Sequence, residues 1–505
     1  MALLVDQLRH MAAAHGAQTA YRDVLQGRDL TFGEWEAESN RLARGLTATG
    51  VTVGDRVALH LESTHDLRWI VAYAAIHKAG AVAVPTNTRL SGRELATILG
   101  HAEPVAVITS SALEGTLDDA RRQLPSLHTV IRADTDEWDR SLADDDSELV
   151  PPVGDDDLAD IMYTSGTTGL PKGIAVRHAG LHIVPNGDPP WTGDKWLHAS
   201  PLFTFAGISF VYNPMKMGMA ALYLSRFDAG AWLDTVEWER PTMAFLVPST
   251  AQLVANHPRF DEADLTSLQL VSIGSSSLPP ALHLRWTRRL RSAAVTNNYS
   301  MTESGTAFTY LPHEDVERKA GSVGVPTGTE IRICDPTGVR VPTGVVGEVR
   351  IRSGGSPREY YRDPAATAAT WDGEWLRTGD LGYLDEDGYL FIVGRAKDVI
   401  IRGGHNVHAA DVEAILYEHP SVSEAAVAAV PHEVLGEDVG AWVVPVDGSG
   451  LTVDELVAFC RERLADYKVP RVVTFLDELP RNPTGKVVKR DLPMPAASDQ
   501  ERTSA

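Results

Sequence analysis

The sequence has few cysteines: its 505 residues contain two, Cys334 and Cys460. Two thiols cannot form the disulfide framework of a small secreted protein, and their scarcity favours a reducing compartment. Cys460 lies in helical register with Leu456 and Leu464, and Cys334 ends a predicted strand. Both thiols are therefore expected to pack in the interior and not to act as nucleophiles.

The chain also has fewer basic than acidic residues. The chain has 46 Lys and Arg residues against 68 Asp and Glu residues, a formal net charge of −22. Such acidity opposes binding to nucleic acid over a broad surface, so no nucleic-acid partner is expected. A small anionic ligand is still compatible with it, because one loop can be locally positive in an acidic protein.

Long hydrophobic runs are absent as well. The first six residues lack the basic flank and the apolar run of a signal peptide. The most apolar stretch, residues 69–85, contains His77 and Lys78 and is shorter than the roughly 20 apolar residues that a membrane-spanning helix needs. We expect a cytoplasmic protein without a membrane span.

What is present is an alternation of strand and helix patterns that extends to about residue 300. Ser/Thr-x-x-Glu capping boxes predict helix starts at Thr31, Ser91 and Thr452. Apolar runs such as residues 81–85 predict buried strands. This alternation favours layered α/β subdomains.

The pattern changes from about residue 329. Residues 330–334 and 347–352 alternate apolar and polar side chains, which predicts an antiparallel, β-rich subdomain. After Gly394, residues 409–418 and 452–466 are predicted helices of a second, smaller unit of α+β type.

Residues 163–173 have the sequence Tyr-Thr-Ser-Gly-Thr-Thr-Gly-Leu-Pro-Lys-Gly. Glycines let a backbone curl until its N–H groups face an anion, the hydroxyls add donors, and Lys172 adds a positive charge. The segment is not a Walker loop, because Pro171 stands where the second glycine should be and no Lys-Ser/Thr pair follows. A simple surface turn is the alternative, but the length and the embedded Pro-Lys-Gly favour a phosphate-binding loop.

This loop resembles the phosphate-loop signature of the adenylate-forming superfamily, which includes acyl-CoA synthetases, peptide-synthetase adenylation domains and luciferases. Further signatures of that superfamily follow in its usual order at residues 297–303, 375–382, 394–398, 401–406 and 481–486. Six signatures in order are very specific, and they extend over nearly the whole chain. The chain is identified as a member of the superfamily, closest to acyl-CoA synthetases.

The resemblance implies a two-step reaction. A carboxylate is a poor acyl donor, so it first attacks the α-phosphorus of ATP, giving an acyl-adenylate and pyrophosphate. The thiol of CoA then displaces AMP. The implied enzyme is an AMP-forming acid–thiol ligase that uses ATP, Mg²⁺ and CoA, and its partners are small molecules.

The resemblance also implies roles for single residues. Tyr299 should lie against adenine, and Asn297 should meet its exocyclic amine. Thr302 should hydrogen-bond the α-phosphate, and Glu303 should be a Mg²⁺ ligand. The β- and γ-phosphates should be held by Thr164, Ser165, Gly166, Thr167, Thr168, Gly169 and Lys172.

Further roles concern the ribose and the smaller domain. Asp380 should accept both ribose hydroxyls, assisted by Arg395. Lys486 should bridge the substrate carboxylate and the α-phosphate. Gly403 and Gly404 lack side chains, so the pantetheine arm of CoA could pass close to their backbone.

The family's hinge position falls on Lys397. The predicted boundaries are therefore residues 1–396 for the N-terminal domain and 397–492 for a mobile C-terminal domain, which would rotate between the two half-reactions. Residues 493–505 are expected to be a disordered tail.

The acyl pocket should contain Phe203, Thr204, Phe205, Gly207, Gly274, Ser275 and Ser276. Thr204 departs from the family, in which an aromatic residue or His is common there, and Ser300 replaces a usual glycine. No Asp follows Phe205 to bind an α-amino group, so an α-amino acid is not expected. The surrounding aromatics favour a hydrophobic or aromatic acid.

Several alternatives stay open. The acyl group could be loaded onto the phosphopantetheine of a carrier protein, or onto another nucleophile, which Thr204 keeps in consideration. The chain could also be a silent nucleotide-binding regulator, although four retained residues together oppose that: Lys172, Glu303, Asp380 and Lys486. His178 and His182 lack an acid partner, so a solvated or hydrogen-bonded pair is expected instead of a zinc site. The oligomeric state is open, with a homodimer as one option.

Overall fold

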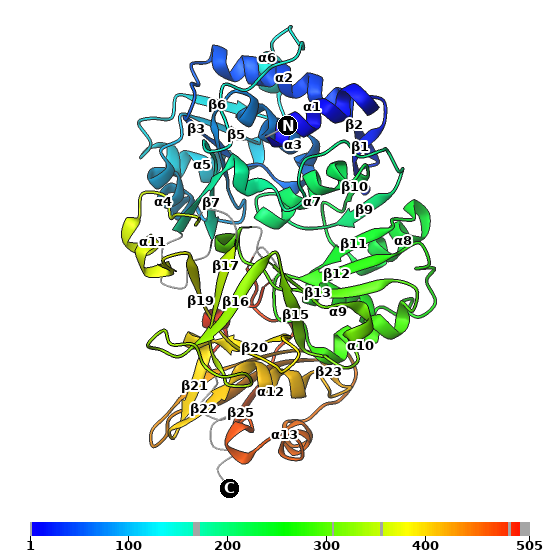
Figure 1. Ribbon diagram of the computed structural model, residues 1–505, viewed down its shortest axis with the longest axis vertical. Coiled ribbons are helices and arrows are strands. Elements are labelled where there is room, and N and C mark those ends of the chain that lie inside the picture. Colours follow the sequence, from blue (N-terminus) through cyan, green and yellow to red (C-terminus); the bar gives the residue numbers. More distant parts are fainter. Residues whose placement is uncertain (1–2, 165–171, 306–307, 354–356, 483–485, 495–505) are drawn as a thin grey trace. The chain divides into compact units, whose positions relative to one another are not determined.

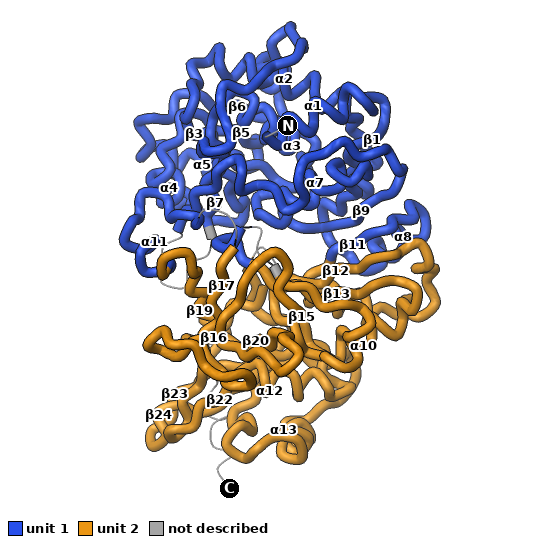
Figure 2. Tube along the Cα trace, viewed as in Figure 1, with its two compact units in different colours: residues 1–245, 301–306, 355–371 blue, residues 246–300, 307–354, 372–505 orange. Residues whose placement is uncertain are grey.

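The computed structural model describes residues 3–164, 172–305, 308–353, 357–482 and 486–494, and it has the mixed α/β fold that the sequence predicts (Figure 1). The chain divides into two compact units (Figure 2). Unit 1 comprises residues 1–245, 301–306 and 355–371, and unit 2 comprises residues 246–300, 307–354 and 372–505. The division at Lys397 and the mobility of the C-terminal domain stay predictions, and most of the expected tail lies outside the described residues.

The first sheet of unit 1 has the strand order β6-β5-β3-β4-β7-β8. All neighbours are parallel except β7 and β8, which are antiparallel. The strands are β3 (Arg56–Leu59), β4 (Val82–Pro85), β5 (Ala106–Thr109), β6 (Thr129–Arg132), β7 (Leu158–Thr164) and β8 (Lys172–Arg177). Every residue of β4 and β5 is buried, which explains why these strands have continuous apolar runs.

The strands β11-β9-β10-β1-β2 lie side by side in a second sheet of unit 1. Their bounds are β1 (Thr19–Asp23), β2 (Arg28–Thr31), β9 (Lys195–His198), β10 (Ala220–Tyr223) and β11 (Met243–Leu246). The helices of unit 1 are α1 (Leu4–His15), α2 (Phe32–Ala48), α3 (Asp66–Lys78), α4 (Gly92–Ala102), α5 (Glu114–Arg121), α6 (Asp136–Ser141), α7 (Phe205–Lys216), α8 (Ala229–Glu239) and α11 (Pro364–Thr370). The capping boxes at Thr31 and Ser91 are confirmed.

Most of α3 lies in the apolar stretch at residues 69–85. Nearly all residues of this helix are buried, which is why the stretch is apolar without being a membrane span. The two polar residues that interrupt the stretch have partners in the core. His77 Nε2 lies 3.0 Å from Asp160 of β7, and the Lys78 ammonium donates to Glu36 at 2.7 Å. Among the described residues, no helix is long and apolar enough to cross a membrane.

Unit 2 begins with α9 (Pro248–Asn256), the parallel strands β12 (Leu270–Gly274) and β13 (Ala294–Asn298), and α10 (Pro280–Arg289). An antiparallel sheet follows with the order β14-β15-β20-β19-β17-β16, which confirms the predicted β-rich part. Its strands are β14 (Phe308–Tyr310), β15 (Ser322–Thr327), β16 (Thr329–Cys334), β17 (Gly347–Ser353), β19 (Trp375–Leu384) and β20 (Leu390–Arg395). The short β18 (Trp371–Asp372) precedes β19.

The last part of unit 2 is a small α+β layer, as expected. It contains β21 (Val399–Arg402), β22 (His405–His408), α12 (Ala409–Leu416), β23 (Val422–His432), β24 (Gly436–Pro445), α13 (Val453–Arg461) and β25 (Val472–Phe475). Helix α13 starts at the predicted capping box but ends at Arg461, five residues before the predicted end. The Cys460 carbonyl accepts from the N–H groups of both Arg463 and Leu464, which closes the helix in a turn. Both cysteines are buried free thiols, as expected.

A buried acidic pair lies at the edge of unit 1. The carboxylates of Asp23, at the end of β1, and Asp66, at the start of α3, are both fully buried. The Arg28 guanidinium lies 3.5 Å from Asp23 and 3.0 Å from Asp66. Burial, with the neighbouring charge of Asp23, raises the pKa of Asp66 to about 7.

This pair predicts a pH dependence of stability. Because the folded state holds the Asp66 proton more tightly than the unfolded chain, the free energy of unfolding should fall as the pH rises from about 4 to about 7. Asp66→Asn should remove roughly 3 kcal/mol of the difference between pH 5 and pH 8, because about two units separate pH 5 from the folded pKa, at about 1.4 kcal/mol per pKa unit. Calorimetric unfolding at both pH values measures this. Asp29→Asn, at an exposed carboxylate nearby, should leave the decline in place, and an unchanged decline in Asp66→Asn would contradict the assignment.

Candidate active site

Only two of the residues predicted for the phosphate loop, Thr164 and Lys172, are among the described residues. The other predicted residues of this loop lie outside the described residues: Ser165, Gly166, Thr167, Thr168 and Gly169. Thr164 is the last residue of β7, and it pairs with Lys172, the first residue of β8. The antiparallel pairing of these two strands brings the two ends of the loop together.

A short segment runs antiparallel to β8 and pairs with it at the Ile174–Tyr360 bridge, next to Lys172. We call residues 357–361 the crossing segment. The Tyr361 N–H donates to the Gly173 carbonyl at 2.7 Å, and the Ala175 N–H donates to the Glu359 carbonyl at 2.8 Å. The Lys172 ammonium lies 5.1 Å from the centroid of the Tyr360 ring, a cation–π contact.

Glu303 meets the same tyrosine. Residues Thr302–Ser304 form a single 3-10 turn, and the Tyr360 hydroxyl donates to Glu303 Oε1 at 3.2 Å. The Arg358 guanidinium donates to the Thr302 carbonyl at 2.5 Å. The structure therefore brings two predicted site residues, Lys172 and Glu303, to one side chain that sequence reasoning missed.

Glu303 fits a Mg²⁺ ion by its chemistry. A carboxylate offers about four lone-pair positions, of which the Tyr360 hydroxyl uses one. Within the described ranges, no group of three or more His, Cys, Asp or Glu side chains is arranged to enclose a metal. That is suitable for Mg²⁺, which is held by one or two carboxylates and takes its other ligands from phosphates and water.

Thr204 has a structural role that the sequence did not predict. Its hydroxyl donates to the Pro201 carbonyl at 2.7 Å and accepts from the Gly207 N–H at 2.9 Å, so Thr204 caps the N-terminus of α7. A Cβ at Gly207 would lie 2.1 Å from the Pro201 oxygen, so only glycine fits there. Phe203 and Phe205 flank the cap, and both are half-buried.

Three residues predicted to bind the nucleoside come together in unit 2. The Tyr299 hydroxyl donates to Asp380 at 2.6 Å, and Arg395 Nε lies 2.9 Å from the same carboxylate. Asp380 and Arg395 are register partners on β19 and β20, so the sheet sets their contact. Burial, with the charge of Asp380, raises the pKa of the Tyr299 phenol well above its usual value, so the phenol stays a donor.

Asn297 lies beside this cluster on β13. Its side chain is buried, and Nδ2 donates to the Ser322 carbonyl at 3.0 Å. This bond fixes the carboxamide with its nitrogen toward the protein, so the oxygen is the atom that could accept from an amine. The predicted contact with the adenine amine thus has the chemistry it requires.

The predicted residues after β12 are at a tight bend. Gly274 is buried at the end of the strand, and Ser276 is exposed. Between them, Ser275 has a φ of +72°, in the left-handed region of backbone conformation that residues other than glycine rarely adopt. Such strain is often found at ligand-binding segments.

The remaining predicted residues lie in the C-terminal part of unit 2. Lys397 is exposed in a single 3-10 turn, and Gly403 and Gly404 both have positive φ in the turn between β21 and β22. Lys486 is exposed, and its backbone N–H donates to the Asn482 side chain at 2.9 Å. The φ of Gly403 is +55°, a backbone conformation in which a residue with a side chain is strained, and this supports the need for glycine there.

His178 and His182 were expected to be solvated or hydrogen-bonded, and this is right for only one of them. His182 contacts the Lys216 ammonium at 2.9 Å, so it has a partner. His178 is buried, and neither of its ring nitrogens has a hydrogen-bond partner among the described residues. Burial lowers the pKa of His178 to about 3, which keeps the ring neutral.

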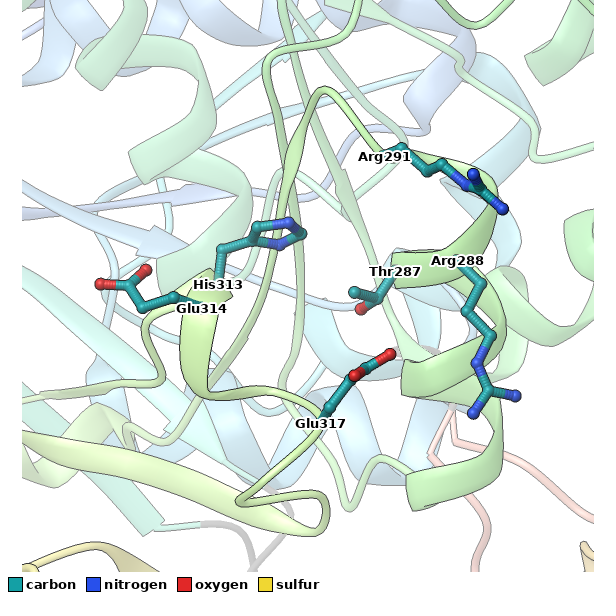
Figure 3. Close-up of a pocket in the computed structure, with 6 residues that line it drawn as sticks. All are labelled: Thr287, Arg288, Arg291, His313, Glu314 and Glu317. Carbon is teal, nitrogen blue, oxygen red and sulfur yellow. The ribbon is translucent and has the colours of Figure 1, made fainter.

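A surface pocket of about 350 Å³ in unit 2 contains none of the predicted site residues. In Figure 3 the guanidinium groups of Arg288 and Arg291 extend away from His313, so the lining does not converge on one ligand. The residues that line it are Thr287, Arg288, Arg291, His313, Glu314 and Glu317.

The fold and these two clusters define an adenylate-forming enzyme. The chain belongs to the AMP-binding enzyme family: the family's profile matches residues 8–361, and the profile of the AMP-binding enzyme C-terminal domain matches residues 411–486. These matches confirm the resemblance stated from the sequence.

Three similar proteins illustrate the family. Feruloyl-CoA synthase of Amycolatopsis sp is 38% identical over 490 residues, covering 92% of this chain and 94% of that protein. Long-chain-fatty-acid–CoA ligase FadD13 of Mycobacterium tuberculosis is 35% identical over 493 residues, covering 95% and 96%. A crystal structure of anthranilate CoA ligase AuaEII with anthranoyl-AMP has a TM-score of 0.86 at 28% identity, covering 96% of this chain and 95% of that one.

The cap at Thr204 gives a prediction. Thr204→Val keeps the shape of the side chain but removes the oxygen, so it should cost about 1 kcal/mol of stability. Thr204→Ser should restore most of it. Calorimetric unfolding of both variants is the measurement. A Thr204→Val protein of unchanged stability that shows only a raised KM for the acid would assign the hydroxyl to the substrate and not to the helix.

Proposed function

We propose that this protein activates a hydrophobic or aromatic carboxylic acid as an acyl-adenylate and transfers the acyl group to the thiol of CoA, releasing AMP and pyrophosphate. The observation that carries the proposal is the match to acid–CoA ligases over more than nine-tenths of the chain. Together with the family match, it supports an AMP-forming acid–thiol ligase that uses ATP, Mg²⁺ and CoA.

The first step brings two anions together, the carboxylate and the polyphosphate, so the protein must supply donors and positive charge. Lys172 supplies an ammonium at the start of β8, next to the loop that would hold the β- and γ-phosphates. Thr302 supplies a hydroxyl for the α-phosphate. Glu303 would hold Mg²⁺, and the ion would neutralise charge on the phosphates.

In unit 2 the nucleoside would be held by the cluster around Asp380. Asp380 is 6% exposed, and its carboxylate would accept the ribose hydroxyls, while Arg395 fixes its orientation from the next strand. The Tyr299 ring would pack against adenine. Lys486 would bring the second ammonium to the carboxylate and the α-phosphate in the adenylation step.

Aromatic packing in unit 1 supports an apolar acyl group. Phe210 of α7 and Phe245 of β11 pack with their ring centroids 4.3 Å apart, and Phe210 also contacts Trp196 at 5.4 Å. The helix position after Phe205 is Ala206, which offers no carboxylate for an α-amino group. These contacts support an aromatic or otherwise bulky acid over an amino acid.

For the second step we propose rotation of residues 397–492 about Lys397. The rotation would withdraw Lys486 and bring the turn that contains Gly403 and Gly404 to the thiol. Lys397 is exposed in a single 3-10 turn, and its side chain is therefore not buried in either neighbouring strand. The acceptor is CoA, with a carrier-protein phosphopantetheine as the alternative, and the proposed location is the cytoplasm.

Lys486 tests the adenylation step. Lys486→Ala should lower acid-dependent exchange of pyrophosphate into ATP by about 10²–10³, the scale of losing one transition-state donor. It should spare the attack of CoA on a pre-made acyl-adenylate. The exchange assay over a panel of aromatic and fatty acids, followed by mass spectrometry with CoA or a carrier protein, also identifies acid and acceptor. Unchanged exchange in the variant would overturn the assignment.

Lys397 tests the rotation. Lys397→Pro fixes φ near −65° and should therefore hold the C-terminal domain in one arrangement. One half-reaction should fall by at least about tenfold more than the other when adenylation and thiol transfer are measured separately. Lys397→Ala is the matched control, because it removes the same ammonium without restricting φ. Equal losses in both half-reactions would exclude a hinge at this residue.

A further inference from the structure

The crossing segment, residues 357–361, is built into unit 1 by backbone bonds on one side and side chains on the other. Its backbone pairs with Gly173 and Ala175 of β8. Its end is held by the Trp371 indole, which donates to the Arg358 carbonyl at 2.9 Å. The side chains of Arg358 and Tyr360 can therefore act from a fixed backbone.

Arg358 fixes the turn that contains Thr302. It is 8% exposed, and its guanidinium donates to the carbonyls of Thr302 and Gly180. The guanidinium also stacks on Phe205, at 4.5 Å from the ring centroid. A buried charge is costly unless it is hydrogen-bonded, so these contacts hold the backbone of the turn against the crossing segment.

Tyr360 then connects the two charged residues of the site. Its hydroxyl donates to Glu303 at 3.2 Å, and its ring face lies 5.1 Å from the Lys172 ammonium. The two contacts use different parts of one side chain.

We propose that Tyr360 is a positioning residue for the metal–nucleotide complex: its hydroxyl orients the Glu303 carboxylate toward the metal, and its ring orients the Lys172 ammonium toward the phosphates. The inference rests on the proposed roles of Glu303 and Lys172. Tyr360 itself touches neither the substrate nor the ion. Its effect is to limit the rotamers of two long side chains, whose ordering would otherwise cost conformational entropy on binding.

Two variants separate the two contacts. Tyr360→Phe removes the hydroxyl and keeps the ring, so it should affect only the metal. Tyr360→Leu removes both, so it should also affect the nucleotide. Tyr361→Phe is the matched control, because it deletes the same hydroxyl at the next residue of the segment, where the ring contacts His101 and Arg362 instead.

Two binding measurements read the contacts without catalysis. Binding of Mn²⁺ in the presence of a non-hydrolysable ATP analogue, followed by electron paramagnetic resonance, should weaken about fivefold to tenfold in Tyr360→Phe, since a hydrogen bond to a charged group is lost. Binding of the analogue without metal, followed by calorimetry, should stay within about twofold in Tyr360→Phe and weaken about threefold in Tyr360→Leu. Tyr361→Phe should match the parent protein in both.

The outcomes distinguish this inference from the proposed function. Unchanged or tighter Mn²⁺ binding in Tyr360→Phe overturns the positioning role, provided that Glu303→Gln abolishes Mn²⁺ binding. Unchanged Mn²⁺ binding in Glu303→Gln overturns the metal role of Glu303 itself. Equal weakening by Tyr360→Phe and Tyr361→Phe, or a loss of thermal stability that accounts for the change, would show that the segment is only structural and would also overturn the proposal.

Discussion

The proposed chemistry requires that an acidic protein keep a few cationic side chains unpaired with carboxylates, so that they can bind anions. The net charge is −22, and about half of the arginines and lysines form ion pairs, as Arg22, Lys195 and Arg318 do. In the described part of the chain, no carboxylate lies within ion-pair distance of Lys172 or Arg358. Their charges face an aromatic ring or backbone carbonyls, which hold a cation without neutralising it. The Lys172 ammonium is therefore not committed to an ion pair in the described part of the chain and could contact a phosphate.

Close backbone packing puts these groups in place. A Cβ at Gly173 would lie 2.8 Å from Ile161, so the glycine lets β8 approach β7 closely beside Lys172. The same argument applies at Gly207, where the start of α7 lies against the Pro201 carbonyl. Small residues at such positions allow long charged side chains to start from fixed points, which reduces the entropy lost when they order around a ligand.

The sequence predicted local features well and long-range contacts poorly. The capping box at Thr452 depends only on residues three apart, so the start of α13 could be predicted. Its end could not, because a carbonyl shared by two later N–H groups leaves no compositional signal. Tyr360 and Arg358 were missed for a related reason: their importance comes from pairing with β8 and from a turn more than fifty residues away. The only signal for them in the sequence was the charged and aromatic run at residues 358–361, which follows the predicted strand at residues 347–352.

The roles expected for the site residues stay predictions, and the structure adds the contacts that surround some of them. Thr204 was predicted from its place in a motif, yet the hydroxyl is engaged in a helix cap, a use that the motif alone does not distinguish from substrate contact. Most residues of the phosphate loop lie outside the described part of the chain, so their roles rest on the motif. For Glu303, the structure adds a hydrogen-bond partner, and this partner makes the metal role testable separately from catalysis.

The cluster around Asp380 shows how the protein can keep a carboxylate both buried and ready for a ligand. A carboxylate removed from water needs donors, and here it has one neutral donor, Tyr299, and one charged donor, Arg395. These two use only part of its acceptor capacity, so a pair of vicinal hydroxyls could be added without displacing either. Because Arg395 comes from the neighbouring strand, the sheet register fixes the direction of the carboxylate before any nucleotide arrives. A ribose would then meet acceptors that are already oriented, and less of its binding energy would be spent on ordering them.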